Sequence, residues 1–206
     1  RPLGQLQYTL VFASYLSPDE LKKHLKNFSK KKIISVSVPL DLKNCYSTKL
    51  SCDDSYDEII SHLVTEHNKT RIAFASAHKT GSVEAFERLD GYKKALEKNG
   101  LSYDESLIFD GVFTYQSIYS DLQEKLKTKE DVKFDAILAA NDMMAFGCIS
   151  ALENLGLKVP DDVKVFGYDN IAQSKKNNLT LSTIDQQIYV QGRTCAELAY
   201  KVINDE

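Results

Sequence analysis

The stretch FDAILAANDMMAFG, residues 134–147, contains the two kinds of segment from which most of the chain is built. Its first seven residues are almost all apolar, as is typical of a strand buried on both faces of a sheet. Asn141 and Asp142 follow, and residues of these types often cap the start of a helix. The pattern then predicts a helix from Met143 to Leu155. A buried strand, a polar junction and a helix together indicate an α/β protein.

The same alternation extends in both directions from this stretch. Strands are predicted at YTLVFAS, IISVSV, RIAFAS, SLIFDG and VKVFGY. Helices are predicted after Ser17, which is the expected cap ahead of Pro18, and over residues 54–64, 83–98, 115–127 and 188–204. Because strands and helices alternate, the strands are expected to be parallel, with right-handed crossovers and helices on both faces. The predicted fold is therefore a doubly wound α/β architecture.

Composition excludes several classes of function. The chain has 206 residues, 43% apolar content and a net charge of -3. It lacks the basic surface of a nucleic-acid-binding domain, so this chain alone is not expected to bind DNA. It has no run of eighteen apolar residues and its start has no signal-peptide pattern, so we expect no membrane segment and a cytoplasmic location. The four cysteines are not at zinc-ligand spacing, and we expect neither a metal nor a cofactor.

Motifs that would indicate catalysis are absent from the sequence. It contains no GxSxG, GxxxxGK[ST], GxGxxG or HExxH motif. A catalytic trio of Ser76, His78 and Asp169 can be drawn, but such residues occur in every α/β protein and their spacing gives no support. We therefore expect a binding protein and not an enzyme.

Polar residues follow three of the predicted strands. They are Asn141 and Asp142 after FDAILAA, Tyr168, Asp169 and Asn170 after VKVFG, and residues 76–82 after RIAFA. Ligands of open parallel sheets bind beyond the carboxyl ends of the strands, so these positions are the first candidates for a binding site. A helix cap explains one of Asn141 and Asp142. It explains Asp169 less well, because no helix starts directly after it, although an Asp-Asn turn stays possible.

Four motifs of the chain are familiar in combination. The strings RLDGYKKAL, FDAILAANDMMAFG, GLKVPDDVKVFGYDN and LSTIDQ together resemble the LacI/GalR family of sugar-responsive regulators. The effector domain of that family has the type I periplasmic-binding-protein fold, with two Rossmann-like lobes and parallel sheets. The resemblance implies an incomplete N-lobe made of residues 1–67 and 187–206, and a C-lobe made of residues 68–186.

The resemblance also implies a set of ligand-binding residues. Arg88 of the RxxGY motif, Asn141 of NDxMA, Asp169 of GYDN and Gln186 of STIDQ match positions that contact hydroxyl groups in the family. Weaker candidates are Ser82, Phe113 and Asp54. Carboxylate, amide and guanidinium groups together can satisfy the donors and acceptors of a polyol, and an aromatic ring can cover the CH face of a sugar.

The function that we expect is the ligand-binding, dimerising effector domain of a LacI/GalR-type regulator that controls DNA binding allosterically. Its partners would be a sugar or sugar derivative, a second copy of the chain, and operator DNA bound through a helix-turn-helix that this chain lacks. Compared with the family, the sequence looks truncated at both ends. A periplasmic-type sugar receptor, or the sensor domain of a kinase or cyclase, stays open as the alternative, since the same fold serves these proteins.

Overall fold

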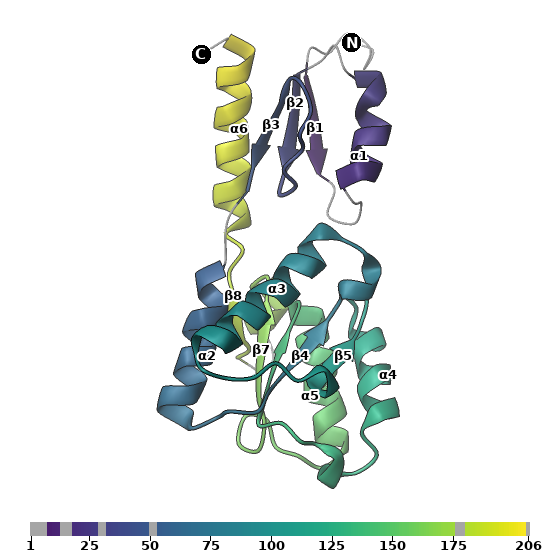
Figure 1. The fold of residues 1–206 in the computed structure, drawn as a ribbon, viewed down its shortest axis with the longest axis vertical. Helices are drawn as coiled ribbons and strands as arrows, with labels where there is room; N and C mark the ends of the chain where they lie inside the picture. Colours follow the sequence, from purple (N-terminus) through teal and green to yellow (C-terminus); the bar gives the residue numbers. More distant parts are fainter. Residues whose placement is uncertain (1–7, 13–17, 29–31, 50–52, 176–179, 205–206) are drawn as a thin grey trace. The chain divides into compact units, whose positions relative to one another are not determined.

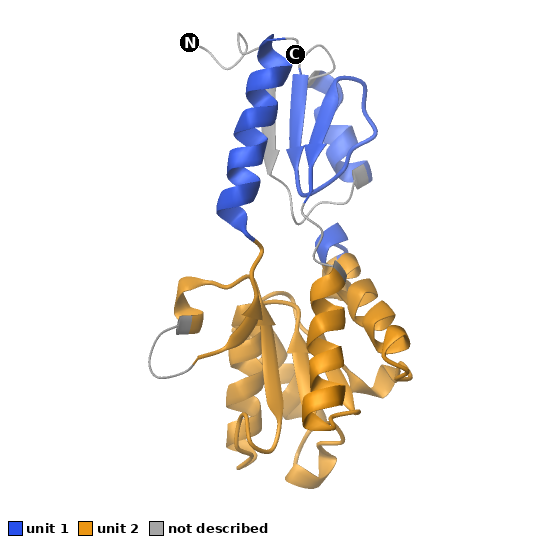
Figure 2. Cartoon of the chain, turned by 90° about the vertical axis from the view of Figure 1, so that its left-hand side faces the viewer, with its two compact units in different colours: residues 1–51, 81–84, 187–206 blue, residues 52–80, 85–186 orange. Residues whose placement is uncertain are grey.

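The structure is a computed structural model that describes residues 8–12, 18–28, 32–49, 53–175 and 180–204 (Figure 1). The chain separates into two compact units, each with its own parallel sheet (Figure 2). Unit 1 consists of residues 1–51, 81–84 and 187–206, and unit 2 consists of residues 52–80 and 85–186.

Unit 1 has a three-stranded sheet in the order β1-β2-β3, with all strands parallel. The hydrophobic residues of β2 face both sides of this sheet, since successive side chains of a strand point in opposite directions. Ile33 packs in one cluster with residues of α1, and Ile34 packs in another with Cys195 of α6. Helices therefore cover both faces. The elements are β1 (Tyr8–Phe12), α1 (Pro18–Leu25), β2 (Lys32–Val36), β3 (Cys45–Thr48) and α6 (Ile188–Asn204), with a short helical turn, η2 (Lys26–Phe28), after α1.

Unit 2 has a five-stranded parallel sheet in the order β5-β4-β6-β7-β8. Its strands are β4 (Ile72–Ser76), β5 (Ile108–Asp110), β6 (Ala136–Ala139), β7 (Lys164–Tyr168) and β8 (Ser182–Ile184). Its helices are α2 (Asp53–His67), α3 (Val83–Lys98), α4 (Tyr115–Lys125) and α5 (Asp142–Asn154). Short helical turns join them: η3 (His78–Thr80), η4 (Glu105–Leu107), η5 (Lys129–Asp131) and η6 (Ala172–Lys175).

The core of unit 2 is centred on β4, whose five residues are all buried. The ring of Phe74 stacks on Tyr92 of α3 with 4.8 Å between ring centroids, and it meets Tyr56 of α2 edge-on at 6.1 Å. The Tyr92 hydroxyl donates to the carbonyl of Ile72 at 2.7 Å, which satisfies its polar atom inside the core. These contacts fix α3, and hence Arg88, against the sheet.

The α/β fold class with parallel sheets is confirmed, and the predicted helices 83–98 and 188–204 have the bounds of α3 and α6. Two strands were not predicted: β3, and β8, which lies in a stretch that looked irregular in the sequence. Helix α1 begins at Pro18, as predicted, whereas its predicted cap, Ser17, lies outside the described residues. None of the described helices is long and apolar enough to cross a membrane.

The two units differ from the predicted lobes in the placement of one helix and of residues 81–84, which were predicted in the C-lobe but belong to unit 1. We predicted that residues 1–67 belong to the N-lobe, but α2 is part of unit 2. The reason is visible in its buried face, because Tyr56, Ile60 and Leu63 pack in the same core as Phe74. The boundary before residue 187 is the same in both divisions.

Candidate functional site

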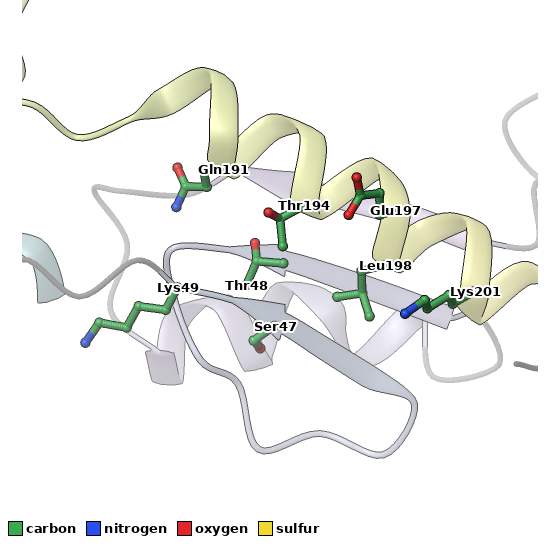
Figure 3. A pocket seen from close by; sticks show the side chains of 8 residues that line it. All are labelled: Ser47, Thr48, Lys49, Gln191, Thr194, Glu197, Leu198 and Lys201. Atoms are coloured by element: carbon green, nitrogen blue, oxygen red, sulfur yellow. The ribbon is translucent and has the colours of Figure 1, made fainter.

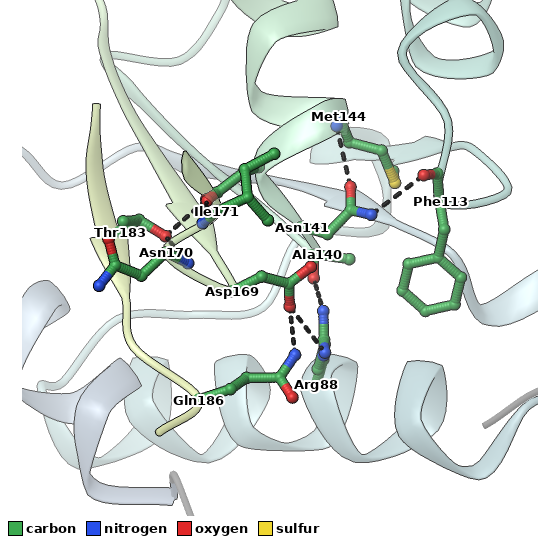
Figure 4. A network of polar contacts seen from close by, with 11 residues as sticks. Arg88, Phe113, Ala140, Asn141, Met144, Asp169, Asn170, Ile171, Thr183 and Gln186 are labelled. Atoms are coloured by element: carbon green, nitrogen blue, oxygen red, sulfur yellow. Dashed lines mark hydrogen bonds and ion pairs between the residues drawn. The ribbon is translucent and has the colours of Figure 1, made fainter. Parts of the chain in front are cut away.

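Arg88, near the start of α3, lies at the carboxyl ends of the central strands of unit 2 (Figure 4). Its side chain is only 5% exposed. One guanidinium nitrogen, Nη1, donates to the carbonyl of Ala140, directly after β6. The guanidinium carbon lies 3.9 Å from the centroid of the Tyr168 ring, within the range of a cation–π contact. Arg88 is thus held in one orientation by contacts from two strands.

Asp169 follows β7 directly and is the ionic partner of Arg88. Its Oδ1 accepts a hydrogen bond from Arg88 Nη2 at 3.2 Å and another from Gln186 Nε2. The Asp169 side chain is 24% exposed, so the carboxylate lies at the edge of the buried network. Three side chains that are far apart in the sequence therefore meet at one carboxylate oxygen.

The backbone around Asp169 has an uncommon conformation. Asp169 has φ 117° and Asn170 has φ 54°, values that residues other than glycine rarely adopt. The Asp169 amide donates to the carbonyl of Ile184 at 2.9 Å, which extends the pairing of β7 with β8. Residues held in rare conformations occur often at binding sites, where the surrounding structure offsets their strain.

Asn141 takes the role of a helix cap and also holds a neighbouring loop. Its Oδ1 accepts from the Met144 amide at 2.9 Å, which caps α5, and its Nδ2 donates to the Phe113 carbonyl at 3.0 Å. Phe113 has φ 62°, and its ring centroid lies 5.5 Å from the Arg88 guanidinium carbon. Asn141 thereby connects α5 to the loop that places an aromatic ring beside Arg88.

Asp142, the first residue of α5, is fully buried and connects three segments. Its Oδ2 accepts from the Ile171 amide at 2.9 Å, and its Oδ1 accepts from the Thr183 hydroxyl at 2.5 Å. Burial raises the pKa of the Asp142 carboxyl, and the bonds from Thr183 and Ile171 oppose that rise. A Cβ atom on Gly167 would lie 2.1 Å from Asp142 Oδ1, so only glycine fits there. The carboxylate fixes both β8 and the loop after β7, which carry Gln186 and Asp169.

Two of the predicted binding residues lie in other parts of the structure than the residues described so far. Ser82 is buried and belongs to unit 1, whereas the network belongs to unit 2. Asp54 is exposed in the first turn of α2, and its charge acts on Lys98. Lys98 is ten residues beyond Arg88 on α3, a separation of about 15 Å along a helix. The structure thus brings together Arg88, Asp169, Gln186, Asn141 and Phe113 within unit 2, and Asp54 lies away from them.

The trio of Ser76, His78 and Asp169 does not form. His78 Nδ1 lies 2.8 Å from Ser76 Oγ and 3.2 Å from Asp110 Oδ1, so the carboxylate beside the imidazole is Asp110. Both groups approach the same ring nitrogen, whereas a catalytic relay needs the serine and the carboxylate on opposite nitrogens. Lys79 also pairs with Asp110, at 2.7 Å. This arrangement gives no support to nucleophilic catalysis.

Other polar features were not predicted from the sequence. In unit 1, a groove of about 390 Å³ lies between β3 and α6 (Figure 3). Thr48 and Thr194 line it from opposite sides, and the buried Thr48 hydroxyl oxygen has no hydrogen-bond partner among the described residues. Among the described residues, no group of three His, Cys, Asp or Glu side chains could hold a metal ion.

Fold and site together define an α/β ligand-binding protein. The family model for the periplasmic binding protein-like domain matches residues 60–206. The chain belongs to this family, and it corresponds to the effector-binding domain of LacI-family transcriptional regulators.

Relatives of known name agree with this assignment. The chain is 28% identical to catabolite control protein A of Priestia megaterium over 204 residues, which is 99% of the chain and 60% of that protein. The transcriptional repressor ascG of Escherichia coli has a similar structure, with a TM-score of 0.79 and 25% identity over 98% of this chain and 72% of that one. The complex of the regulator CelR with cellobiose gives a TM-score of 0.79 and 26% identity, covering 97% and 59% of the two chains. These relatives are regulators, in accord with the expectation that the chain is not an enzyme.

Proposed function

We propose that unit 2 binds a hydroxyl-rich small molecule, a sugar or sugar derivative, at the network of Arg88, Asp169 and Gln186. The observation that carries this proposal is the convergence of a guanidinium, a carboxylate and an amide at Asp169 Oδ1. These groups come from α3, the end of β7 and the segment after β8, so the fold itself assembles them. Asp169 and Gln186 are both partly exposed, so a ligand can reach them.

The chemistry of the three side chains suits a polyol. Each sugar hydroxyl is both a donor and an acceptor, a carboxylate accepts, a guanidinium donates, and an amide does both. Hydrogen bonds to ionised groups are about twice as strong as neutral ones, so Asp169 and Arg88 would contribute most of the polar affinity. The ring of Phe113, near Arg88, offers an apolar surface for the CH face of a pyranose.

Similarity supports a sugar as the ligand class. CelR, whose structure resembles this chain, forms a complex with cellobiose. We include Asn141 in the proposed site because its side chain binds the backbone of Phe113. Ser82 and Asp54 stay weaker candidates for contacts with the ligand.

We further propose that the chain regulates DNA binding in a longer protein. The chain spans 60% of the length of catabolite control protein A, so a DNA-binding segment would lie outside it. Ligand binding would favour one of two states that differ in DNA affinity, which is the thermodynamic definition of allostery. A homodimer inside the cell suits such a regulator, because operators have two-fold symmetry. A sugar receptor of a transport or signalling system is the second candidate, since the same fold binds ligands there.

A thermal-shift screen with cellobiose, sucrose and monosaccharides tests the proposed site. A ligand at a hundredfold its dissociation constant should add about 2.7 kcal/mol to the stability of the chain. A dye must report unfolding, because the sequence has no tryptophan. Asp169→Ala and Gln186→Ala should each remove the sugar-dependent stabilisation. Asp90→Ala, an exposed change on the same helix as Arg88, is the matched control and should keep it.

The Asp169→Ala variant removes the carboxylate that pairs with the buried Arg88, and this loss can prevent folding. The Gln186→Ala variant removes only a neutral side chain, so it tests the site in that case. A folded Gln186→Ala variant with an undiminished response to the sugar would show that the assigned site is wrong.

A further inference from the structure

Unit 2 contains a cavity of about 450 Å³ at the opposite end of its sheet from Asp169. Lys164, the first residue of β7, and Ser182, the first residue of β8, both line it. Asp169 follows the last residue of β7, and five strand residues span about 16 Å. The cavity is therefore separate from the proposed sugar site.

The polar part of this cavity is basic. His62 and His67 contribute from α2 and Lys164 contributes from β7, and the hydroxyls of Thr180 and Ser182 add neutral polar groups. The rings of His62 and His67 meet edge to face, with centroids 4.9 Å apart, so both imidazoles can contact one ligand. Within the described part of the chain, no acidic side chain lines the cavity. The charge of the cavity lining is thus opposite in sign to the net charge of the chain, which is -3.

The remaining surface of the cavity is apolar. Ile149, Val165 and Leu181 are buried residues that line it, and Phe166, which also lines it, is partly buried. A cavity with basic groups on one part of its surface and apolar groups on the other matches an amphiphilic anion, because each part of such a ligand finds a suitable environment.

The charges around His67 repel one another in the absence of an anion. Partial desolvation lowers the pKa of His67, although its side chain is exposed, and the positive charge of Lys164, the neighbouring His62 and Lys69 act in the same direction. Glu66, on the same helix, acts in the opposite direction. A bound anion would relieve the repulsion and favour the protonated imidazole.

We propose that this cavity binds a small organic anion, with a phosphate or carboxylate group between His62, His67 and Lys164 and an apolar body against Val165 and Leu181. The ligand and the proton bind His67 cooperatively, since each favours the other. Affinity should therefore increase as the pH falls from 8 to 6, and the bound ligand should raise the pKa of His67.

NMR of the histidine rings tests this proposal in the 206-residue chain. The sequence has four histidines, and His24 and His78 lie outside the cavity and serve as internal references. Phenyl phosphate should shift the ring signals of His62 and His67 and raise the pKa of His67. Benzoate tests the carboxylate form of the ligand. Benzyl alcohol, which is neutral, should have no effect, and inorganic phosphate should bind more weakly because it lacks the apolar body.

Variants identify the charge that binds the anion. Lys164→Gln should weaken phenyl phosphate binding about tenfold or more, as expected for a lost charge-assisted hydrogen bond. Lys23→Gln makes the same change of charge on the exposed surface of α1 and should leave affinity unchanged. Circular dichroism shows that each variant is folded.

Two results would overturn the proposal. One is the absence of any shift at His62 and His67 with millimolar phenyl phosphate or benzoate. The other is that no anion binds to the chain and that a His67→Gln substitution changes its sedimentation. That result would show that a second copy of the chain, and not an anion, occupies the cavity. Neither result bears on the sugar response of Asp169, so the two sites are tested independently.

Discussion

The buried carboxylate of Asp142 is predicted to hold together the segments that carry the sugar site. An Asp142→Asn substitution keeps the shape of the side chain but turns one acceptor oxygen into an NH2 group. If the NH2 group faces Ile171, the amide loses its acceptor, and if it faces Thr183, the hydroxyl loses the charged acceptor to which it donates and must turn its proton elsewhere. An unsatisfied buried donor costs about 1–3 kcal/mol, so we expect a loss of about 2 kcal/mol. For a chain of this size, that loss lowers Tm by about 4–8 °C.

The pH dependence of this cost follows from the raised pKa of Asp142. A folded-state pKa above the unfolded value means that the stability contributed by the group is fully present below the unfolded pKa. It is lost as the pH rises through the folded pKa. The difference in unfolding free energy between the natural chain and the Asp142→Asn variant should therefore be larger near pH 4 than near pH 7.

Denaturant unfolding at the two pH values measures both effects. The control is Asp162→Asn, which makes the same chemical change at an exposed carboxylate that accepts from the Lys158 amide at 2.7 Å. Water replaces the lost partner there, so we expect a cost below about 1 kcal/mol. Equal losses in the Asp142 and Asp162 variants would refute the reasoning, as would a cost at Asp142 that grows between pH 4 and pH 7.

Three further predictions concern other parts of unit 2. Gly147→Ala should destabilise the chain by about 1–3 kcal/mol in denaturant unfolding, because its Cβ would lie 2.6 Å from the backbone oxygen of Tyr115; a neutral result would contradict the close approach of α4 and α5. Tyr92→Phe should cost about 1–3 kcal/mol by leaving the buried Ile72 carbonyl without its side-chain donor, and a cost near zero would show that the bond is dispensable. The lowered pKa of His67 means that its contribution to stability is present above the unfolded pKa and lost as the pH falls through the folded pKa. His67→Gln should therefore flatten the fall of Tm between pH 7.5 and 5.5, and an unchanged slope would contradict this.

Much of the fold could be predicted from the sequence because the buried strands and amphipathic helices of unit 2 have clear patterns. The strands β3 and β8 could not, since CYST and STI are short and mostly polar and take their strand form from pairing with β2 and β7. The sequence also did not show which unit α2 belongs to. Its apolar face showed that the helix is buried, but periodicity does not show which sheet covers that face.

The site was predictable in part. The rule that ligands bind at the carboxyl ends of parallel strands, together with the family resemblance, selected Arg88, Asp169 and Gln186, and the structure brings these three together. That Asn141 is the helix cap agrees with the expectation that a cap explains one of the two junction residues. The hydrogen bonds that the Asp142 carboxylate accepts could not be predicted from the sequence, because one of the donors is a backbone amide 29 residues away.

The most direct test of the central claim is a crystal structure of the chain with the sugar that stabilises it most. The account predicts a sugar hydroxyl within about 2.7–3.2 Å of the Asp169 carboxylate, with Arg88 and Gln186 contacting the same molecule. A sugar bound elsewhere, such as in the groove between β3 and α6, with no contact to Asp169 or Arg88, would contradict it.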